Sequence, residues 1–162
     1  MTDSIVRQTA REVVPLRETA TVGAATRRVI DSGLPALPVV DAEGRFAGIF
    51  GEREFMAALF PGYMNELASA RMVRRSIDET IERRVECSTE AIGAHLTTDQ
   101  VLVEDDCSDT QLAEIFLHHR VLIVPIATQG RVHAVVTRHD FFLDLAQRFA
   151  RVAEDPSKPN RP

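Results

Sequence analysis

The acidic run Glu104-Asp105-Asp106 places three carboxylates side by side in the sequence. Carboxylate oxygens are the ligands that hard cations such as Mg²⁺ prefer, so the run could form a Mg²⁺ sensor. It also stands just before Ser108, a residue type that commonly caps a helix. A solvated turn that leads into a helix is therefore the simpler interpretation, and the cation site is the weaker alternative.

Histidines are common metal ligands, and the chain has five, His95, His118, His119, His133 and His139. The adjacent His118 and His119 would point away from one another on a helix, and the others fit no known ligand spacing. Cys87 and Cys107 are the only cysteines and form no C-x-x-C pair. We expect no metal site and two reduced thiols, as in a cytoplasmic protein.

Motifs of catalysis are missing from the sequence. It contains no G-x-S-x-G elbow, no Walker-type phosphate loop and no H-E-x-x-H pair. No serine or cysteine has an obvious histidine and acid partner. We therefore expect that the protein is not an enzyme.

The pattern Thr137-x-x-Asp140 follows the apolar stretch 132–136 and opens a helical stretch. In the simplest interpretation Thr137 caps this helix by accepting a hydrogen bond from the Asp140 N–H. The Asp140 carboxylate would then also be favourable at the positive end of the helix dipole.

Composition excludes several classes of partner. A formal net charge of −5, no Trp and a single Tyr argue against nucleic-acid binding, which needs a basic surface or aromatic rings for stacking. No apolar run approaches the roughly 20 residues that a membrane span requires. The polar start MTDSIVRQTARE lacks the apolar core of a secretory signal, which again indicates the cytoplasm.

The elements that must position Thr137 and Asp140 occur twice in the chain. Residues 34–40 match residues 121–127 so that Pro38 meets Pro125, an offset of 87. The match extends backwards, where Thr21 meets Ser108, and forwards past one single-residue gap, where Glu54 meets Asp140. The chain is therefore a tandem duplication, with about 45 aligned positions in each copy.

Each copy has the same order of predicted elements, β-α-β-β-α. A short apolar strand (13–16 and 101–103) leads to a helix capped by Thr21 or Ser108. Two strands then follow (37–40 and 46–50; 123–126 and 132–136), and a last helix begins near Glu52 or Arg138. The predicted fold class is α+β, with mixed α/β halves of about 50 residues that must pack on one another to bury both sheets.

These motifs resemble a known family. The first copy contains Gly33-x-x-x-x-Pro38-Val39-Val40-Asp41 and then Gly44-Arg45-Phe46-Ala47-Gly48-Ile49, and the second ends in Thr137-Arg138-His139-Asp140. They are similar to CBS domains, named after cystathionine β-synthase, and two in tandem resemble a Bateman module. On this basis we predict a first CBS domain at 5–60, an inserted helical linker at 61–92, a second CBS domain at 93–150 and a disordered tail at 151–162.

The resemblance implies a pseudo-twofold pair of half-domains with two clefts for adenine nucleotides or adenosyl ligands. In such modules a [Ser/Thr]-x-x-Asp motif carries the ligand, since the carboxylate can accept hydrogen bonds from both ribose hydroxyls and the helix start can bind phosphate. The matching residues are Thr137 and Asp140, with Arg138 and His139 as candidate phosphate contacts. Three further positions match those that flank the adenine, namely Val121, Ile123 and Pro125. Each of these seven residues also has a structural interpretation, as a cap, a solvated helix-start residue or a core strand residue.

The first copy departs from the pattern. Gly51 and Glu54 stand where Thr137 and Asp140 stand in the second copy, so the hydroxyl is missing and the carboxylate is displaced by one methylene. We therefore expect the first cleft to be empty or weak, and one ligand per chain. Arg53 could reach phosphate in the other site.

The resulting hypothesis is a stand-alone, non-catalytic sensor that needs no obligatory cofactor. It would bind AMP, ADP, ATP or a ligand similar to S-adenosylmethionine, and signal to an unknown regulated protein. We expect a homodimer, because the outer helix faces need cover at six positions, Phe55, Met56, Leu59, Phe141, Phe142 and Leu145. The alternative from another class is a structural scaffold dimer with vestigial clefts.

Overall fold

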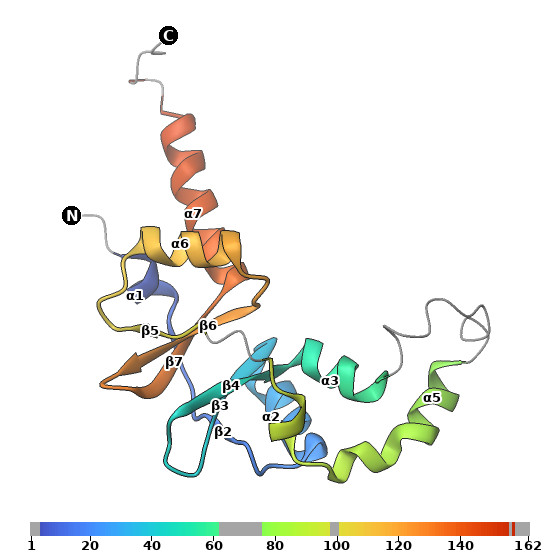
Figure 1. Cartoon of the computed structure of the whole chain (residues 1–162). Helices are drawn as coiled ribbons and strands as arrows, with labels where there is room; N and C mark the ends of the chain where they lie inside the picture. Colours follow the sequence, from blue (N-terminus) through green and yellow to red (C-terminus); the bar gives the residue numbers. More distant parts are fainter. Residues whose placement is uncertain (1–3, 62–75, 98–100, 156, 158–162) are drawn as a thin grey trace.

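The protein is described by a computed structural model over residues 4–61, 76–97, 101–155 and 157 (Figure 1). Two halves with the same order of elements are present. The first half contains β2 (Leu16–Arg17), α2 (Val22–Ser32), β3 (Ala36–Val40), β4 (Phe46–Gly51) and α3 (Glu52–Leu59). The second half contains β5 (Val103–Glu104), α6 (Asp109–His118), β6 (Ile123–Thr128), β7 (Arg131–Thr137) and α7 (Arg138–Ala153). The predicted α+β fold with tandem β-α-β-β-α units is confirmed.

The two sheets repeat the same pairing. Strand β2 pairs parallel with β3, which pairs antiparallel with β4, and β5, β6 and β7 repeat this arrangement. Even the irregularity recurs, because the register shifts between Val39 and Val40 in one hairpin and between Ile126 and Ala127 in the other. The duplication seen in the sequence therefore extends to the details of strand pairing.

The predicted helix starts are correct. The Thr21 hydroxyl oxygen accepts a hydrogen bond from the Ala24 N–H, and Ser108 accepts one from the Gln111 N–H. These bonds satisfy backbone donors that a helix start otherwise leaves without partners. Helices α3 and α7 begin at Glu52 and Arg138, as the sequence predicted.

The segment that precedes each half packs on the other half. We call residues 5–12 and 92–97 the leading segments. Helix α1 (Ile5–Thr9) lies against α6 and α7, and β1 (Arg11–Glu12) pairs with β7, so both belong spatially to the second half (Figure 1). In the opposite direction the 3-10 helix η3 (Ile92–His95) contacts α3 and β4. The pairing is equivalent at both places, with Arg11 beside Val135 and Thr97 beside Ile49.

This crossing explains why the first strand is shorter than predicted, whereas the strand predicted over residues 101–103 is displaced to Val103–Glu104. The chain passes from β1 to β2 at Val13 and Val14, where the Val13 N–H donates to the His133 carbonyl and Val14 is 72% exposed. Residues that hold the two halves together at this point cannot also pair within the first sheet. The strand predicted over residues 13–16 therefore begins only at Leu16.

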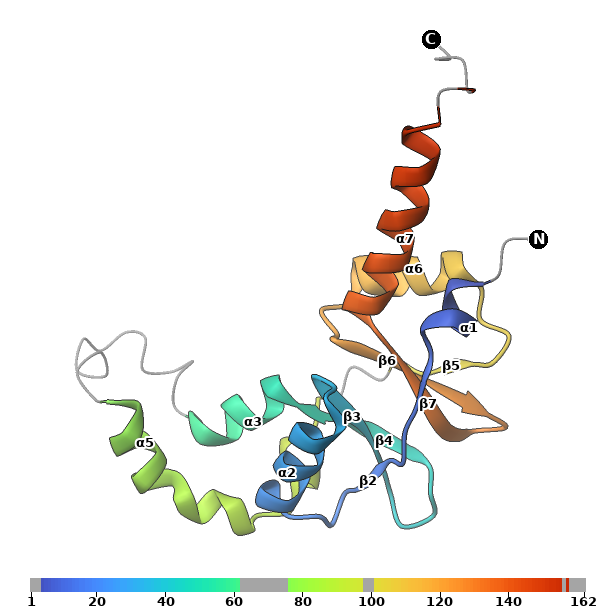
Figure 2. The same cartoon turned by 180° about the vertical axis from the view of Figure 1, so that it is seen from behind.

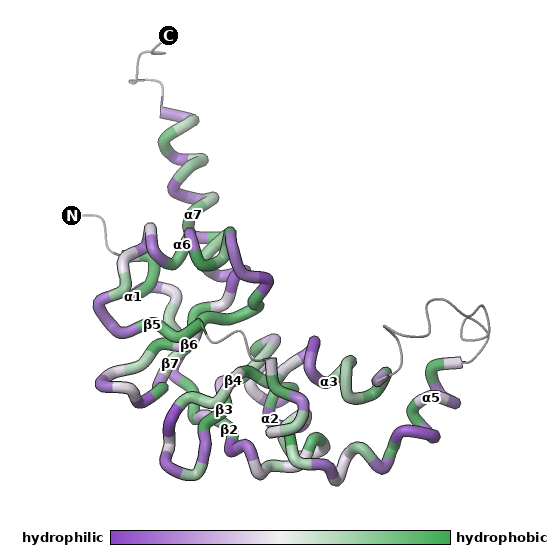
Figure 3. Tube along the Cα trace, in the orientation of Figure 1, coloured by the Kyte–Doolittle hydropathy of each residue, from purple (hydrophilic) through white to green (hydrophobic). Residues whose placement is uncertain are grey.

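The buried apolar side chains form two clusters. One cluster of buried side chains is centred on the first half but includes Ile123 and Val135 of the second sheet. A second cluster contains Ile5 and Val6 of α1 packed with Leu112 and Phe141. Figure 3 shows the hydrophobic stretches concentrated in the central strands, whereas hydrophilic and hydrophobic segments alternate along α7.

Between the halves the structure describes α5 (Ile77–Arg84) and the 3-10 helix η2 (Val85–Thr89). The predicted helical linker also covers residues 62–75, which lie outside the described residues. Helix α7 ends at Ala153 and projects beyond the rest of the fold (Figure 2), so residues 151–153 of the predicted tail are helical. Residues 156 and 158–162 of that tail lie outside the described residues. Among the described helices, none has the length and apolar character needed to cross a membrane.

Candidate functional site

A cleft of about 850 Å³, measured with its open mouth, lies between the two halves. We call it the Asp140 cleft. Its wall is formed by the end of β7 and the start of α7, by the chain after α2 and by one residue of β1. The lining residues are Arg11, Gly33, Leu34, Pro35, Leu122, Thr137, Arg138, His139, Asp140 and Phe142.

Four of the seven predicted site residues line this cleft, namely Thr137, Arg138, His139 and Asp140. The other three do not. Val121 lines a different cleft, and Ile123 and Pro125 are fully buried in the sheet and line neither of the two. The proposed contact of these three strand residues with a ligand stays a prediction, and residues 33–35 of the first half line the Asp140 cleft.

The start of α7 is a capped helix end. The Thr137 hydroxyl oxygen accepts the Asp140 N–H at 2.9 Å, and the Arg138 N–H donates to the Leu122 carbonyl at 2.9 Å. The structural interpretation of Thr137 is therefore confirmed, and two of the backbone donors expected to bind phosphate are already used. The cap does not use the Asp140 carboxylate, since only the backbone N–H of Asp140 takes part in it.

The two basic residues that follow Thr137 differ in how their side chains are held. The Arg138 side chain donates from Nε to the Val121 carbonyl at 3.0 Å, and its Nη2 contacts the same oxygen. This arginine therefore braces the strand that precedes α7. His139 is exposed at the cleft wall.

Sequence reasoning did not find Arg11, which contacts the Asp140 carboxylate. Arg11 Nη2 lies 2.8 Å from Oδ2 and 2.9 Å from Oδ1, and the aligned hydrogen bond goes to Oδ1. Oδ2 is buried and lacks an aligned donor. The Arg11 side chain is 51% exposed and that of Asp140 only 18% exposed. Residues so distant in sequence meet only because the leading segment crosses to the second half.

The repeat places a second cleft, of about 300 Å³, at the equivalent position of the first half. We call it the Glu54 cleft. Its wall comes from β3, β4 and the start of α3, from the chain before β6 and from Thr97, two residues after η3. The lining residues are Ala36, Ile49, Arg53, Glu54, Thr97, Arg120, Val121 and Leu122.

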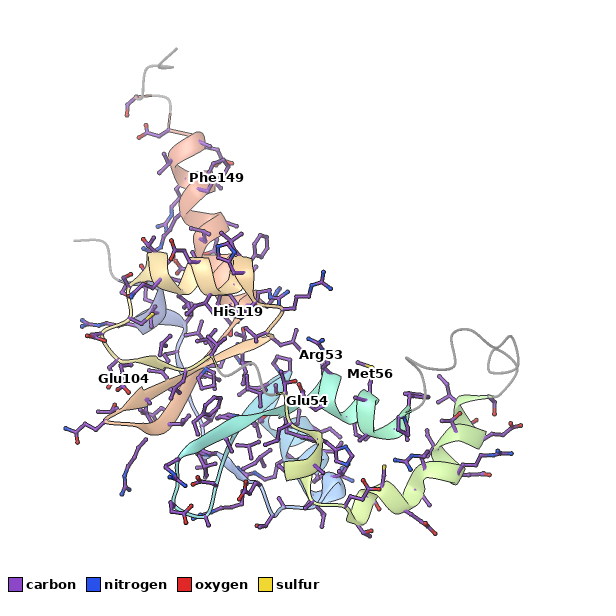
Figure 4. The ribbon with its side chains drawn as sticks, in the orientation of Figure 1. Arg53, Glu54, Met56, Glu104, His119 and Phe149 are labelled. Atoms are coloured by element: carbon purple, nitrogen blue, oxygen red, sulfur yellow. The ribbon has the colours of Figure 1, made fainter. Side chains whose placement is uncertain are left out.

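The carboxylate of the Glu54 cleft is occupied by its own chain. Glu54 Oε2 accepts the Gly51 N–H at 3.0 Å, and Oε1 accepts the Thr97 hydroxyl. Thr97 stands where Arg11 stands in the other cleft. Glu54 is only 6% exposed and Arg53 extends to the Arg120 carbonyl across the cleft, at the junction of the halves (Figure 4). Both oxygens of Glu54 therefore have an internal partner.

Gly51 has a steric reason for lacking a side chain. A Cβ added at Gly51 would lie 2.3 Å from the Ala36 Cβ and 2.3 Å from the Pro35 carbonyl oxygen. Real Cβ atoms do not approach other atoms so closely. The hydroxyl that Thr137 supplies in the second copy consequently has no space in the first.

The acidic run 104–106 forms a solvated turn. Asp105 accepts hydrogen bonds from the Thr128 hydroxyl and from the His133 ring at 2.9 Å, and these bonds lower its pKa below the ordinary 3.8. Glu104 and Asp106 are exposed. Over the described residues no group of three or more His, Cys, Asp or Glu side chains is placed to hold a metal ion. Cys87 and Cys107 are both free thiols.

Comparison with known proteins identifies the fold. Residues 6–61 match the family model for the CBS domain. A CBS-domain protein from Agrobacterium tumefaciens (ATU1752) has 20% identity, with 87% of this chain and 95% of that chain covered and a TM-score of 0.64. The CBS domain of a membrane protein from Sphaerobacter thermophilus has 25% identity, 86% coverage of both chains and a TM-score of 0.66.

A third solved structure is CBSX2 in complex with AMP, at 17% identity, with 87% of this chain and 93% of that chain covered and a TM-score of 0.60. No curated protein sequence matches the chain. The family model covers the first half, and the solved structures share the arrangement of both halves. Residues 6–61 therefore match a CBS domain, and the chain as a whole shares the fold of these solved structures.

Proposed function

We propose that this protein is a regulatory module that binds an adenine nucleotide or a related adenosyl ligand in the Asp140 cleft and signals to a partner protein. CBS domains are regulatory modules, and CBSX2 has been solved with AMP. The observation that carries the proposal is the Asp140 carboxylate in the wall of an open cleft that both halves form. A carboxylate can accept hydrogen bonds from the two neighbouring hydroxyls of a ribose.

Binding there would connect the halves. Residues 33–35 come from the first half and residues 137–140 from the second, so one ligand would contact both. A ligand that binds one relative position of the halves more tightly shifts the population toward that position. This shift is the signal that a partner protein would detect.

The proposal has a direct test in a thermal-shift screen with AMP, ATP, S-adenosylmethionine and MgCl₂, followed by isothermal titration of the stabilising ligand. We expect stabilisation by an adenosyl ligand, since a ligand that binds only the folded state raises its stability. The titration should give one site per chain. Two sites of similar affinity would contradict the assignment to a single cleft.

A scaffold with vestigial clefts is the competing function, and the internal partners of Glu54 and Asp140 are the observations in its favour. The same screen decides between the two. Stabilisation by none of the adenosyl ligands, in a protein that melts cooperatively, would favour the scaffold.

We also propose a homodimer formed through α7. Of the six positions predicted to need cover, Leu59 and Phe141 are buried and Phe55 packs against the core. Met56, Phe142 and Leu145 are exposed, and four exposed apolar residues follow α7 at intervals of three and four, namely Phe142, Leu145, Phe149 and Val152. This is the spacing of a helix-pairing seam, and Phe149 lies on the projecting part of the helix (Figure 4).

A second copy of the chain is the partner that this seam fits, because the seam would be complementary to itself across a twofold axis. Light scattering at tens of micromolar should give twice the mass of 18.0 kDa. Phe149→Glu should shift the protein to a monomer, whereas Leu117→Glu, at an exposed position of α6, should not. A monomeric wild type would contradict the dimer.

A further inference from the structure

The carboxylate that the proposed ligand needs already has a cationic partner. Arg11 contacts both oxygens of Asp140 within 2.9 Å. Among the described residues, neither side chain forms a hydrogen bond or an ion pair with a third residue. A carboxylate can accept more than two hydrogen bonds, but ribose hydroxyls that take the position of this guanidinium would displace Arg11. Binding at Asp140 therefore involves an exchange of partners.

The pair is placed where such an exchange is feasible. Arg11 is 51% exposed, so water can screen its charge and replace its hydrogen bonds when it leaves Asp140. Asp140 is more enclosed, and its Oδ2 has no aligned donor in the free protein. A ligand that supplies two hydroxyl donors would satisfy both carboxylate oxygens, which Arg11 alone does not.

The displaced guanidinium would stay inside the same cleft. The other groups there that could bind phosphate are already held by hydrogen bonds or are not permanently charged. Arg138 is fixed to the Val121 carbonyl, and the N–H groups of Arg138 and Asp140 are used by Leu122 and Thr137. His139 carries a charge only when protonated, whereas an arginine is charged at every physiological pH. Among the described residues that line the cleft, Arg11 is thus the permanent positive charge with freedom to move.

We infer that Arg11 is a selectivity latch. In the free protein it holds the Asp140 carboxylate, and on binding it transfers to the phosphate of the ligand while the ribose takes the carboxylate. The latch makes the cleft specific for phosphorylated adenosines, because a ligand without an anionic group releases Arg11 without giving it a new partner. This inference rests on the proposed function and specifies its ligand class.

The test compares AMP with adenosine by isothermal titration, for the wild type, Arg11→Ala and Arg11→Gln. The wild type should bind AMP at least about tenfold more tightly than adenosine, since phosphate forms charge-assisted hydrogen bonds with arginine. Both variants should lose AMP affinity by about tenfold or more. Their affinity for adenosine should rise by about two- to fivefold, because the competing ion pair has been removed.

Opposite changes for the two ligands distinguish a latch from a merely structural arginine, whose removal would weaken both. Arg45→Ala is the matched control, as Arg45 is an exposed arginine that pairs with Asp41 and Glu43 on the β3–β4 hairpin. It should change neither affinity. Thermal melts of all variants establish that the titrations are made on folded protein.

Two results would overturn the inference, and they differ from one another. If the wild type binds AMP and adenosine equally, or if Arg11→Ala weakens both to the same extent, the latch is wrong and the proposed function stands. If the wild type binds neither AMP, adenosine nor S-adenosylmethionine, the proposed function fails and the latch fails with it.

Discussion

The Asp140 cleft and the Glu54 cleft occupy equivalent positions of a duplicated fold, but their polar groups are used differently. In the Asp140 cleft the cap hydroxyl comes from Thr137, and the carboxylate faces an exposed arginine. In the Glu54 cleft the longer carboxylate turns back to the backbone of its own helix start, and a threonine hydroxyl from the crossing segment takes its other oxygen.

The difference shows how small changes alter the role of one repeat. A glutamate can reach the N–H of Gly51 and cap α3 with its own side chain, so the helix needs no hydroxyl there. With the hydroxyl gone, the strand can approach Pro35 and Ala36 closely. The Glu54 cleft measures about 300 Å³ with its open mouth, and the Asp140 cleft about 850 Å³. The carboxylate of the first copy is thus bound by its own chain, whereas that of the second copy lies in the wall of the larger cleft.

The largest effect is expected for Asp140→Ala. Two charge-assisted hydrogen bonds to the ribose, each worth roughly 1.5–3 kcal/mol, would be lost. At about 1.4 kcal/mol per decade, AMP affinity should fall by about a hundredfold or more, measured by titration below the melting transition. A lowered melting temperature with an unchanged dissociation constant would mean that Asp140 serves only the helix start.

The next effect is on stability and comes from Gly51→Ala. The added Cβ would collide with the Pro35 carbonyl and Ala36, and overpacking of this kind costs about 3 kcal/mol. The equivalent change in the other copy, Thr137→Ala, removes only the cap and should cost about 1 kcal/mol. Urea unfolding of both variants gives the two losses of unfolding free energy. Equal losses would show that the two helix starts are packed alike.

Glu54→Ala should destabilise the protein by about 2 kcal/mol, because it leaves the Gly51 N–H and the Thr97 hydroxyl without their acceptor in a buried place. AMP affinity should remain within about twofold of the wild type. Glu52→Ala is the control, since Glu52 lies in the same first turn of α3 and is exposed. A large loss of AMP affinity in Glu54→Ala would place ligand in the Glu54 cleft.

The smallest effect concerns Asp109, which anchors the segment that carries Arg11. Asp109 accepts hydrogen bonds from the Ser4 hydroxyl and from the Ile5 and Val6 N–H groups. Partial burial raises the pKa of Asp109, but these bonds outweigh burial and hold the pKa below 3.8. Because asparagine keeps one acceptor oxygen at this partly buried position, Asp109→Asn should cost about 1 kcal/mol at pH 7.

The sign of the pH dependence follows from the lowered pKa. The stabilisation is fully present above the unfolded-state pKa of about 3.8 and is lost as the pH falls through the lower folded-state value. The difference in unfolding free energy between wild type and Asp109→Asn should therefore shrink below about pH 4. A difference that stays constant down to pH 2 would indicate that the charge of Asp109 has no role.

Local signals in the sequence were sufficient for much of this fold. The caps at Thr21, Ser108 and Thr137 depend on residues three positions away, so their spacing alone predicts them. The departure at Gly51 and Glu54 was visible from the alignment of the two copies. What the sequence could not show was which half each leading segment would contact, because nothing local distinguishes pairing within a half from pairing across halves.

Three differences between the predicted and the observed site follow from that limit. Arg11 meets Asp140 through a crossing whose contact spans 129 residues, and no spacing rule covers such a distance. Arg138 could be predicted as a cation near the cleft, but its direction toward the Val121 carbonyl depends on the position of the preceding strand. The buried Ile123 likewise faces the first half's core, which a repeat alignment alone does not indicate.

The exchange of leading segments also has a consequence for the order of assembly on the ribosome. Helix α1 is synthesised among the first residues, but its docking partners at Asp109 and on α6 and α7 emerge roughly a hundred residues later. Contacts between distant parts of a chain form slowly, because a long loop must close first. We expect the core of the first half to remain incomplete until Ile92, Ile123 and Val135 have left the exit tunnel, since all three belong to that core. The N-terminal helix, made first, would then be among the last elements to fold.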